Sequence, residues 1–366
     1  MDYDTYQKYL KTGVISGLKF FFCIKEADGQ LVFNKNSGAC PYETKEGLCG
    51  IQLKYGEDYL CEVCATYPRL TYNYGFHAEE YLDLSCPSVV KLLLEDDSAD
   101  LFVTGEKEIH EAPYGTNEDP IYLNLLDKIR NQIYSYIIFS SEEVPVIAAK
   151  LIKLGNEIQK SFIEERCEYV DEGYADRIFK ITDDILKKSE DDPGLQGASN
   201  DKVKVDESIK IYPDYQVIDR IIRGGFYHIR LKNTSPFLYK LCKYYFSQFG
   251  GKNVRANEEK FRAISESFFE DAFLNKTIRK YLGYRIATTF TTAYDDFNFL
   301  RKISIPIVES QLLMIFIWLF ENNEDKANIN NMCDIISVFT RRSGHRESAG
   351  KELFLEAYED IIAPII

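Results

Sequence analysis

The sequence lacks several features that would place it in a membrane or outside the cell. Its N-terminus is acidic and polar, without the basic residues and apolar stretch of a signal peptide. The most apolar run, Leu312 to Phe320, is nine residues long, whereas a helix needs about 20 apolar residues to cross a bilayer. We therefore expect a cytoplasmic protein without a membrane span, whose cysteines stay reduced.

Motifs of the common catalytic classes are also missing. No GxGxxG, GxxxxGK[ST], GxSxG or HExxH sequence is present, so no dinucleotide site, P-loop, hydrolase elbow or zinc-protease helix is indicated. The CxxxCxxC motif of radical enzymes is incomplete, because Glu57 stands where its first cysteine would precede Cys61 and Cys64. The residues alone therefore identify no catalytic residue and no cofactor pocket.

Histidine is scarce, with four residues, and tryptophan occurs once, at Trp318. His77 lies between Cys64 and Cys86, where it is either a metal ligand or an exposed residue without a special role. His345 follows a Thr-Arg-Arg-Ser-Gly sequence near a helix break, which favours a capping or surface role. Neither histidine indicates catalysis by itself.

Acidic residues outnumber basic ones, 58 against 44, which gives a net charge of −14. A negative surface repels phosphate backbones, so nucleic acid is not an expected partner. The same charge suits a basic partner, including a protein that presents exposed lysines. The oligomeric state does not follow from the sequence.

Apolar residues make up 45% of the chain and aromatic residues 14%, which favours a well-filled interior. We predict a mainly α fold, in which a small, cysteine-rich and loop-rich N-terminal module with one β-hairpin is attached to a large α-helical domain. The predicted domains are 1–95, a module that binds a metal or cluster, and 96–366, an α-helical domain with a flexible loop near 189–208.

Individual elements follow from local signals. Two strands flank a turn at Asp28-Gly29, and Pro87 opens a helix at a position where its missing N–H is tolerated. Helices are predicted over 121–139 and from a Ser140–Glu143 capping box through Phe162. The other predicted helices are 175–188, 213–223, 235–248, 256–281, 283–296, 303–320, 327–342 and 347–362.

Cysteine is concentrated near the N-terminus. Five of the nine cysteines fall between residues 40 and 87, with Cys23 upstream, and they are Cys40, Cys49, Cys61, Cys64 and Cys86. Clustered, reduced thiols in a segment with few apolar residues favour zinc or iron ligation, although the spacing does not match a regular zinc ribbon. The alternative is that these are free, buried thiols. The cysteines expected in the helical core are Cys167, Cys242 and Cys333.

Aromatic residues follow the cysteines closely. The residues in question are Tyr67, Arg69, Tyr72, Tyr74 and Tyr81. In one interpretation they pack around a small metal-bound module. In the other they line a pocket for a cationic side chain, which the faces of tyrosine rings attract.

The cysteine-rich stretch carries a family pattern. Residues 38–69, GACPYETKEGLCGIQLKYGEDYLCEVCATYPR, and residues 81–94, YLDLSCPSVVKLLL, contain Cys-Pro-Tyr, Gly-Leu-Cys-Gly-Ile, Cys-Ala-Thr-Tyr-Pro-Arg and Leu-Ser-Cys-Pro. The N-terminal DYDTYQKYL and, more loosely, SVFTRRSGH at 337–345 add to the pattern. Together these segments resemble the flagellin lysine-N-methylase family of bacteria.

The resemblance implies a protein-lysine N-methyltransferase that acts on flagellin, with S-adenosylmethionine as methyl donor and a 4Fe-4S iron–sulfur cluster on the cysteines. Zinc is the alternative metal. The ligands carried over by position are Cys40, Cys49, Cys64 and Cys86, and the second-rank candidates are Cys61 and Cys23. The alternative function is a non-catalytic zinc- or iron-binding module for protein–protein interaction.

One segment of the family pattern is not found in this chain. Family members usually have a Cys and a Cys-Cys pair upstream of the Asp-x-x-Thr-Tyr stretch, whereas this chain begins at Met1 almost on that stretch. We expect a shortened relative, or a gene start that excludes the segment. Cys23 or Cys61 would then complete the ligand set.

Overall fold

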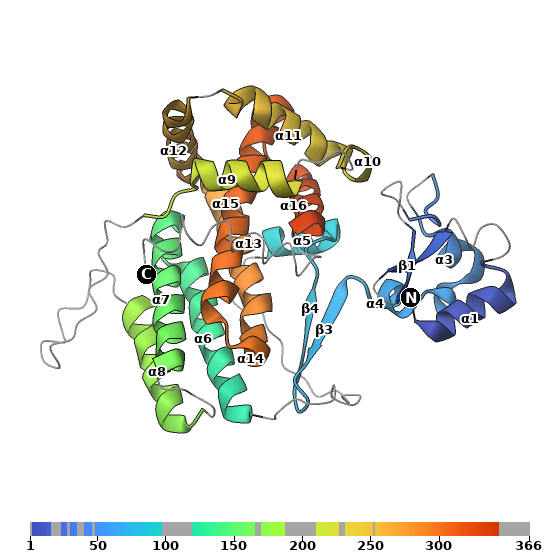
Figure 1. Ribbon diagram of the computed structural model, residues 1–366, viewed down its shortest axis with the longest axis horizontal. Coiled ribbons are helices and arrows are strands. Elements are labelled where there is room, and N and C mark those ends of the chain that lie inside the picture. Colours follow the sequence, from blue (N-terminus) through green and yellow to red (C-terminus); the bar gives the residue numbers. More distant parts are fainter. Residues whose placement is uncertain are drawn as a thin grey trace, which may run out of the picture.

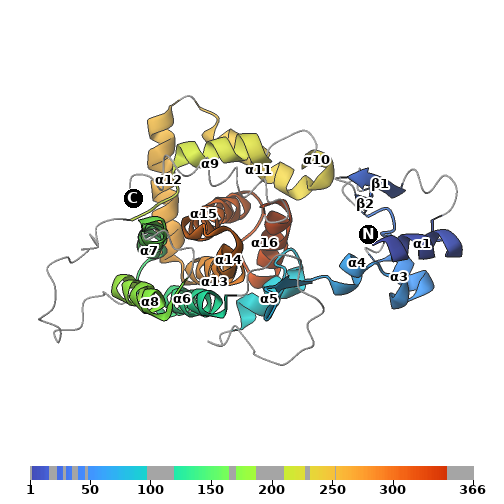
Figure 2. The ribbon, with the colours of Figure 1, turned by 60° about the horizontal axis from the view of Figure 1, so that its bottom comes forward.

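A large helical body and a smaller N-terminal module lie at opposite ends of the molecule, joined by a β-hairpin (Figure 1 and Figure 2). This arrangement comes from a computed structural model of the chain. The structure describes residues 2–15, 23–27, 30–34, 40–45, 48–96, 119–164, 170–186, 210–226, 231–251 and 253–343.

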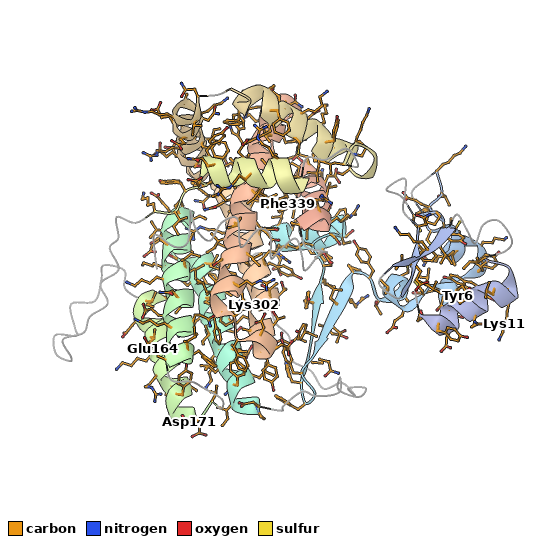
Figure 3. All side chains as sticks on the ribbon, viewed as in Figure 1. Tyr6, Lys11, Glu164, Asp171, Lys302 and Phe339 are labelled. Atoms are coloured by element: carbon orange, nitrogen blue, oxygen red, sulfur yellow. The ribbon has the colours of Figure 1, made fainter. Side chains whose placement is uncertain are left out.

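The N-terminal module is built from short elements around a small apolar cluster. Its elements are α1 (Tyr3–Thr12), β1 (Ile24–Ala27), β2 (Gln30–Phe33), α3 (Gly50–Tyr55), the 3-10 helix η1 (Glu57–Tyr59) and α4 (Glu62–Thr66). The buried members of the cluster are Tyr9, Val14, Ile15, Ile24 and Ile51. Tyr6 of α1, labelled in Figure 3, packs against them. Because this core is small, polar contacts must also hold the module together.

A second hairpin, absent from the sequence-based prediction, follows the module. Strand β3 (Arg69–Asn73) pairs antiparallel with β4 (Ala78–Leu82), and α5 (Pro87–Glu95) begins after a short turn. Tyr72 and Tyr74 belong to the apolar cluster of the helical body, whereas Tyr59 packs against that of the module. The two clusters thus separate between Tyr59 and Tyr72, and the domain boundary near residue 95 stays a prediction.

The helical body consists of thirteen further elements in the described part of the chain. They are α6 (Pro120–Phe139), α7 (Val144–Glu164), α8 (Glu172–Leu186), α9 (Tyr215–Ile221), the π-helix η2 (Ile222–Phe226), α10 (Leu231–Thr234), α11 (Pro236–Phe249), α12 (Val254–Glu270), α13 (Ala272–Thr289), the 3-10 helix η3 (Phe290–Thr292), α14 (Ala293–Asp296), α15 (Phe299–Asn323) and α16 (Ile329–Ser343). Helices α6, α7 and α8 lie side by side, and α9, α11 and α12 cover the end at the top of Figure 1.

Helix α15 is the centre of this body and packs against α7, α11, α13 and α16. Every side chain from Gln311 to Ile317 is buried. Phe316 also contacts Phe339 of α16, labelled in Figure 3, with ring centroids 5.8 Å apart. Among the described residues, α15 is the one helix long and apolar enough to cross a membrane, but most of its apolar window is buried inside the protein. Its hydrophobicity is therefore accounted for by the core, as predicted for Leu312 to Phe320.

The mainly α fold with a small N-terminal module is confirmed, but two helix boundaries were wrong, because the predicted break between 281 and 283 lies inside α13 and a break was missed at 271. The apolar periodicity predicted an unbroken helix over 256–281, whereas the chain breaks at Asp271. The Asp271 carboxylate accepts hydrogen bonds from the N–H groups of Phe273 and Leu274, at 2.9 and 3.0 Å, and so begins α13. A local capping signal thus prevails over a continuous apolar pattern.

Several predictions fall outside the described residues. They are the turn at 28–29, Cys167, the flexible loop near 189–208, His345 and the helix over 347–362.

Candidate functional site

Cys40 and Cys49 are brought together by a tight pairing of backbone segments. The N–H of Gly50 donates to the carbonyl of Tyr42 at 2.7 Å, and Glu43 forms an isolated β-bridge with Cys49. A Cβ atom on residue 50 would lie 2.9 Å from the Tyr42 carbonyl oxygen, so this close approach requires glycine. Gly50 therefore fixes Cys49 beside the segment that carries Cys40.

Cys61 and Cys64 form a thiol pair at the start of α4. Cys61 precedes the helix and is 2% exposed, whereas Cys64 lies one turn on and is exposed. A hydrogen bond between the two side chains lowers the pKa of Cys61 to about 6 and raises the pKa of Cys64. The two sulfurs share one proton near neutral pH, which favours a thiolate at Cys61.

Four cysteines share one electrostatic neighbourhood in the module. After the hydrogen bond to Cys61 and burial, the sulfurs of Cys40 and Cys49 further raise the pKa of Cys64. Tyr9 of α1 is fully buried beside them, and burial followed by Cys61, Cys64 and Cys49 raises its pKa. The structure therefore places Cys49, Cys61 and Cys64 near Tyr9, and Cys40 near Cys64.

Asp2 ties α1 to the helix that carries the thiol pair. Its carboxylate accepts hydrogen bonds from the N–H of Thr5 at 2.7 Å and from the N–H of Glu62, the first residue of α4, at 3.3 Å. Burial opposes ionisation, but these hydrogen bonds lower the pKa of Asp2 to about 2. Asp2 is therefore ionised at neutral pH and holds the start of α4 in place.

Cys86 lies apart from this group, whereas Cys23 and Cys40 both act on Tyr42 of the module. Cys86 precedes α5 and packs against the apolar cluster of the helical body. Cys23 packs against the cluster of the module, where burial and then the Cys23 thiol raise the pKa of Tyr42 to about 12. Cys86 was a first-rank candidate from its position in the sequence and Cys61 a second-rank one, whereas in the structure Cys61, Cys40 and Cys49 all act on Cys64.

These cysteines do not form a finished metal site in the described part of the chain. No group of three or more His, Cys, Asp or Glu side chains there is placed to hold a metal ion. The arrangement as it stands does not fit a four-ligand site, and we assign no chemical step to a metal. The ligand set Cys40, Cys49, Cys64 and Cys86 stays a prediction.

The helical body contains a cavity of about 660 Å³ between β4, α5, α6 and α13. Its walls combine apolar side chains of α5 and α6, such as Leu92 and Phe139, with the tyrosine rings of Tyr81, Tyr134 and Tyr284. Its charged lining residues are Glu80, Asp96, Lys276, Arg279 and Lys280. A volume and lining of this kind are typical of small-ligand sites.

Two consecutive cations of α13 hold the ends of two helices that border the cavity. Lys280 donates from Nζ to the carbonyl oxygens of Leu94 at 2.9 Å and Asp96 at 2.5 Å, at the end of α5. Arg279 donates to the carbonyls of Ile137 at 3.0 Å and Ser140 at 2.8 Å, at the end of α6. Cations are favoured at helix C-termini, so both contacts stabilise the cavity walls.

The tyrosines beside the cysteines do not pack around the cysteine-rich module, because Tyr72 and Tyr74 belong to the apolar cluster of the helical body. Tyr74 is buried and lies against Tyr72 and Tyr294, with centroids 5.0 and 5.3 Å apart, which is aromatic packing. Tyr81 of β4 lines the cavity instead. His77 stacks on Tyr74 at 6.3 Å.

Known proteins resemble part of this chain. It is 30% identical over 88 residues to a lysine-N-methylase of Salmonella typhimurium and, equally, to one of Salmonella choleraesuis. It is 31% identical over 80 residues to the flagellar biosynthetic protein FliU of Salmonella muenchen. The matches cover 24% of this chain and 21% of each methylase, and 22% of this chain and 46% of FliU. The chain thus spans less than half the length of these relatives, and neither a family model nor a solved structure matches it.

Sequence reasoning missed the cavity and the cations of α13. Lys280 and Arg279 belong to a basic stretch that reads as an ordinary helix surface, and their carbonyl partners lie more than 130 residues away. No local pattern brings α5, α6 and α13 together.

Proposed function

We propose that this chain is a protein-lysine N-methyltransferase that acts on surface lysines of flagellin, with S-adenosylmethionine as methyl donor. The observation that carries the proposal is the similarity over 88 residues to two proteins named lysine-N-methylase. The similarity to a flagellar biosynthetic protein supports flagellin as the substrate. The net charge of −14 suits a substrate that presents lysines.

The chemistry sets two requirements for such a site. A lysine side chain in water has a pKa near 10.4 and must lose a proton before its nitrogen can attack a methyl group. Burial, or another cation close by, favours the neutral amine. The site must also hold the amine and the donor methyl group in contact, since methyl transfer depends on alignment of the reacting atoms.

A cysteine-bound iron–sulfur cluster, or zinc, is part of the proposal. The observation in its favour is that Cys40, Cys49, Cys61 and Cys64 lie in one module, although the described side chains would have to move closer together to hold a metal ion. Such a group would supply a structural crosslink for a module with a small apolar core. Metal analysis and an absorption spectrum of protein purified without oxygen test this part separately, because a thiolate-bound iron cluster absorbs visible light and zinc does not.

Mass spectrometry of flagellin tests the main proposal. Flagellin from a strain that lacks this protein should lose its methyl-lysines, and reintroducing the intact gene should restore them. Unchanged lysine methylation in the deletion strain would rule the proposal out.

The second candidate function is a metal-binding module for protein–protein interaction without catalysis. The observation in its favour is that the thiols lie in a module with its own apolar cluster. Purified protein that binds metal in a fixed ratio but shows no heat of binding with S-adenosylmethionine would support this candidate.

A further inference from the structure

We infer that the cavity between β4, α5, α6 and α13 is the place where the methyl donor and the target lysine meet. This inference rests on the proposed function and adds a location to it. The cavity lies in the helical body, against α5, and not among the thiols of the module.

The size of the cavity suits two ligands that must touch. Ligand sites commonly enclose about 300–1,000 Å³, and this cavity of about 660 Å³ lies in the middle of that range. A donor of the size of S-adenosylmethionine would leave room for a lysine side chain. The reacting atoms could then approach to about 3–3.5 Å, as direct transfer requires.

The tyrosines suit the charge of both ligands. A sulfonium and a protonated lysine are both cations, and the faces of Tyr81, Tyr134 and Tyr284 attract cations. The Tyr284 hydroxyl is committed to the strand, since it accepts a hydrogen bond from the N–H of Leu82 at 3.1 Å. Its ring is therefore fixed against β4, as a preformed wall should be.

The charged residues around the cavity favour a neutral amine inside it. Glu80 and Asp96 attract both the incoming ammonium and the sulfonium, whereas Lys276, Arg279 and Lys280 disfavour a further positive charge, which the lysine, unlike the sulfonium, avoids by losing its proton. Burial acts in the same direction as the three cations. The lysine therefore loses its proton to solvent on entry.

The transfer itself balances without a further reagent. The neutral nitrogen of the lysine attacks the methyl carbon, so an N–C bond forms while the S–C bond of the sulfonium breaks. The electron pair of that bond stays on sulfur, which leaves a neutral thioether. The methylated nitrogen carries the positive charge until it releases a proton.

The mouth of the cavity suits a polypeptide substrate. Leu92 of α5 and Phe139 of α6 both line the cavity and are each 60% exposed, so two large apolar side chains face solvent at its edge. Exposed apolar residues beside a cavity are typical of a surface that contacts another protein. A lysine on such a protein would reach into the cavity from this side.

Substitutions at the mouth test the inference without disturbing the core. Leu92→Arg places a long cation across the entrance, Leu92→Ala leaves it open, and Ile163→Arg makes the same kind of change on the exposed face of α7, at a side chain that is 67% exposed. The measurements are the affinity for S-adenosylhomocysteine by calorimetry and methyl-lysine on flagellin by mass spectrometry. We expect Leu92→Arg to weaken binding by roughly tenfold or more and to reduce methylation, Leu92→Ala to have a smaller effect in the same direction because it keeps the entrance open, and Ile163→Arg to behave like the unchanged protein.

The outcomes separate this inference from the proposed function. If flagellin methylation requires the protein but Leu92→Arg binds and methylates normally, the location is wrong and the proposed function stands. If Leu92→Arg and Ile163→Arg weaken binding equally, the location is likewise wrong. If Leu92→Arg alone loses affinity for S-adenosylhomocysteine, the donor site is in the cavity. This conclusion holds even if a deletion strain keeps its methyl-lysines, a result that would reject flagellin as the substrate.

Discussion

Arg341 donates from Nε to the carbonyl oxygen of Ser85 at 2.9 Å, although 256 residues separate the two in sequence. Ser85 immediately precedes Cys86, in the Leu-Ser-Cys-Pro sequence, and Arg341 lies in the SVFTRRSGH stretch of α16. Both segments were expected from the sequence to belong to the pattern of the flagellin lysine-N-methylase family. The structure brings them into direct contact, so the end of α16 positions the loop that carries Cys86.

Replacing Arg341 with alanine should loosen this loop. Hydrogen bonds that involve a charged group contribute about 1.5–3 kcal/mol, and because Arg341 is exposed we expect a loss just below this range, about 1 kcal/mol. Urea unfolding measures the change. The control is Arg255→Ala on the exposed face of α12, which should change the free energy of unfolding by less than about 0.5 kcal/mol. Equal effects of the two changes would contradict a role for the contact.

A methyl group on Gly50 should disturb the thiol group of the module. Gly50→Ala places a Cβ 2.9 Å from the Tyr42 carbonyl, so the pairing that fixes Cys49 must open. We expect a loss of about 1–3 kcal/mol and a lower metal content if the module binds metal. Gly251→Ala is the control, because nothing lies within 4 Å of the Cβ it adds. A Gly50→Ala protein with unchanged stability would show that the turn is not required.

The ion pair between Arg285 and Glu309 should matter far more than a surface pair. The Arg285 Nε lies 2.9 Å from the Glu309 carboxylate, whose side chain is 1% exposed. Removing one partner of a buried pair leaves an uncompensated charge and costs about 3–5 kcal/mol, so Glu309→Ala should destabilise the helical body strongly. Glu259→Ala breaks the exposed pair with Arg255 and should cost less than about 0.5 kcal/mol. Thermal unfolding of both variants provides the comparison.

The sequence was informative where a signal is local. Apolar residues at helical spacing placed α6 within one residue of its start, and the apolar run around Leu312 identified the core helix α15. The prediction from apolar periodicity was wrong at Asp271, because the capping side chain of this residue begins a new helix inside a continuous apolar pattern.

The arrangement of the candidate site depends on tertiary contacts that the spacing of the cysteines in the sequence does not reveal. Cys86 precedes a helix whose apolar face packs on the helical body, whereas Cys61 faces Cys64 across one turn of α4. Which cysteines meet was therefore decided by tertiary packing. The cavity is even harder to predict from the sequence, because four elements from three regions of the chain enclose it.

Stability should fall at alkaline pH. Burial raises the pKa of both Tyr134 and Tyr284 to about 12, against about 10 in the unfolded chain. Between these values the unfolded chain has lost protons that the folded protein keeps, so the contribution is complete below about pH 10 and disappears toward pH 12. Circular dichroism and tyrosinate absorbance should change together over that range. Tyr134→Phe should make the fall less steep, and an identical slope would contradict this origin.

Alkylation should distinguish the thiols of the module from those of the core. Burial raises the pKa of Cys242 to about 12, so at pH 8 it is a protonated, fully buried thiol that iodoacetamide does not reach. Cys64 is exposed and shares one proton with the Cys61 thiolate, so a thiol of this pair should be labelled in the folded protein, as peptide mass spectrometry would show. If the module binds zinc, added zinc should protect Cys64 and leave Cys242 unchanged, because only the former lies among other thiols. Labelling of Cys242 as fast as Cys64 before urea is added would contradict the core position of α11.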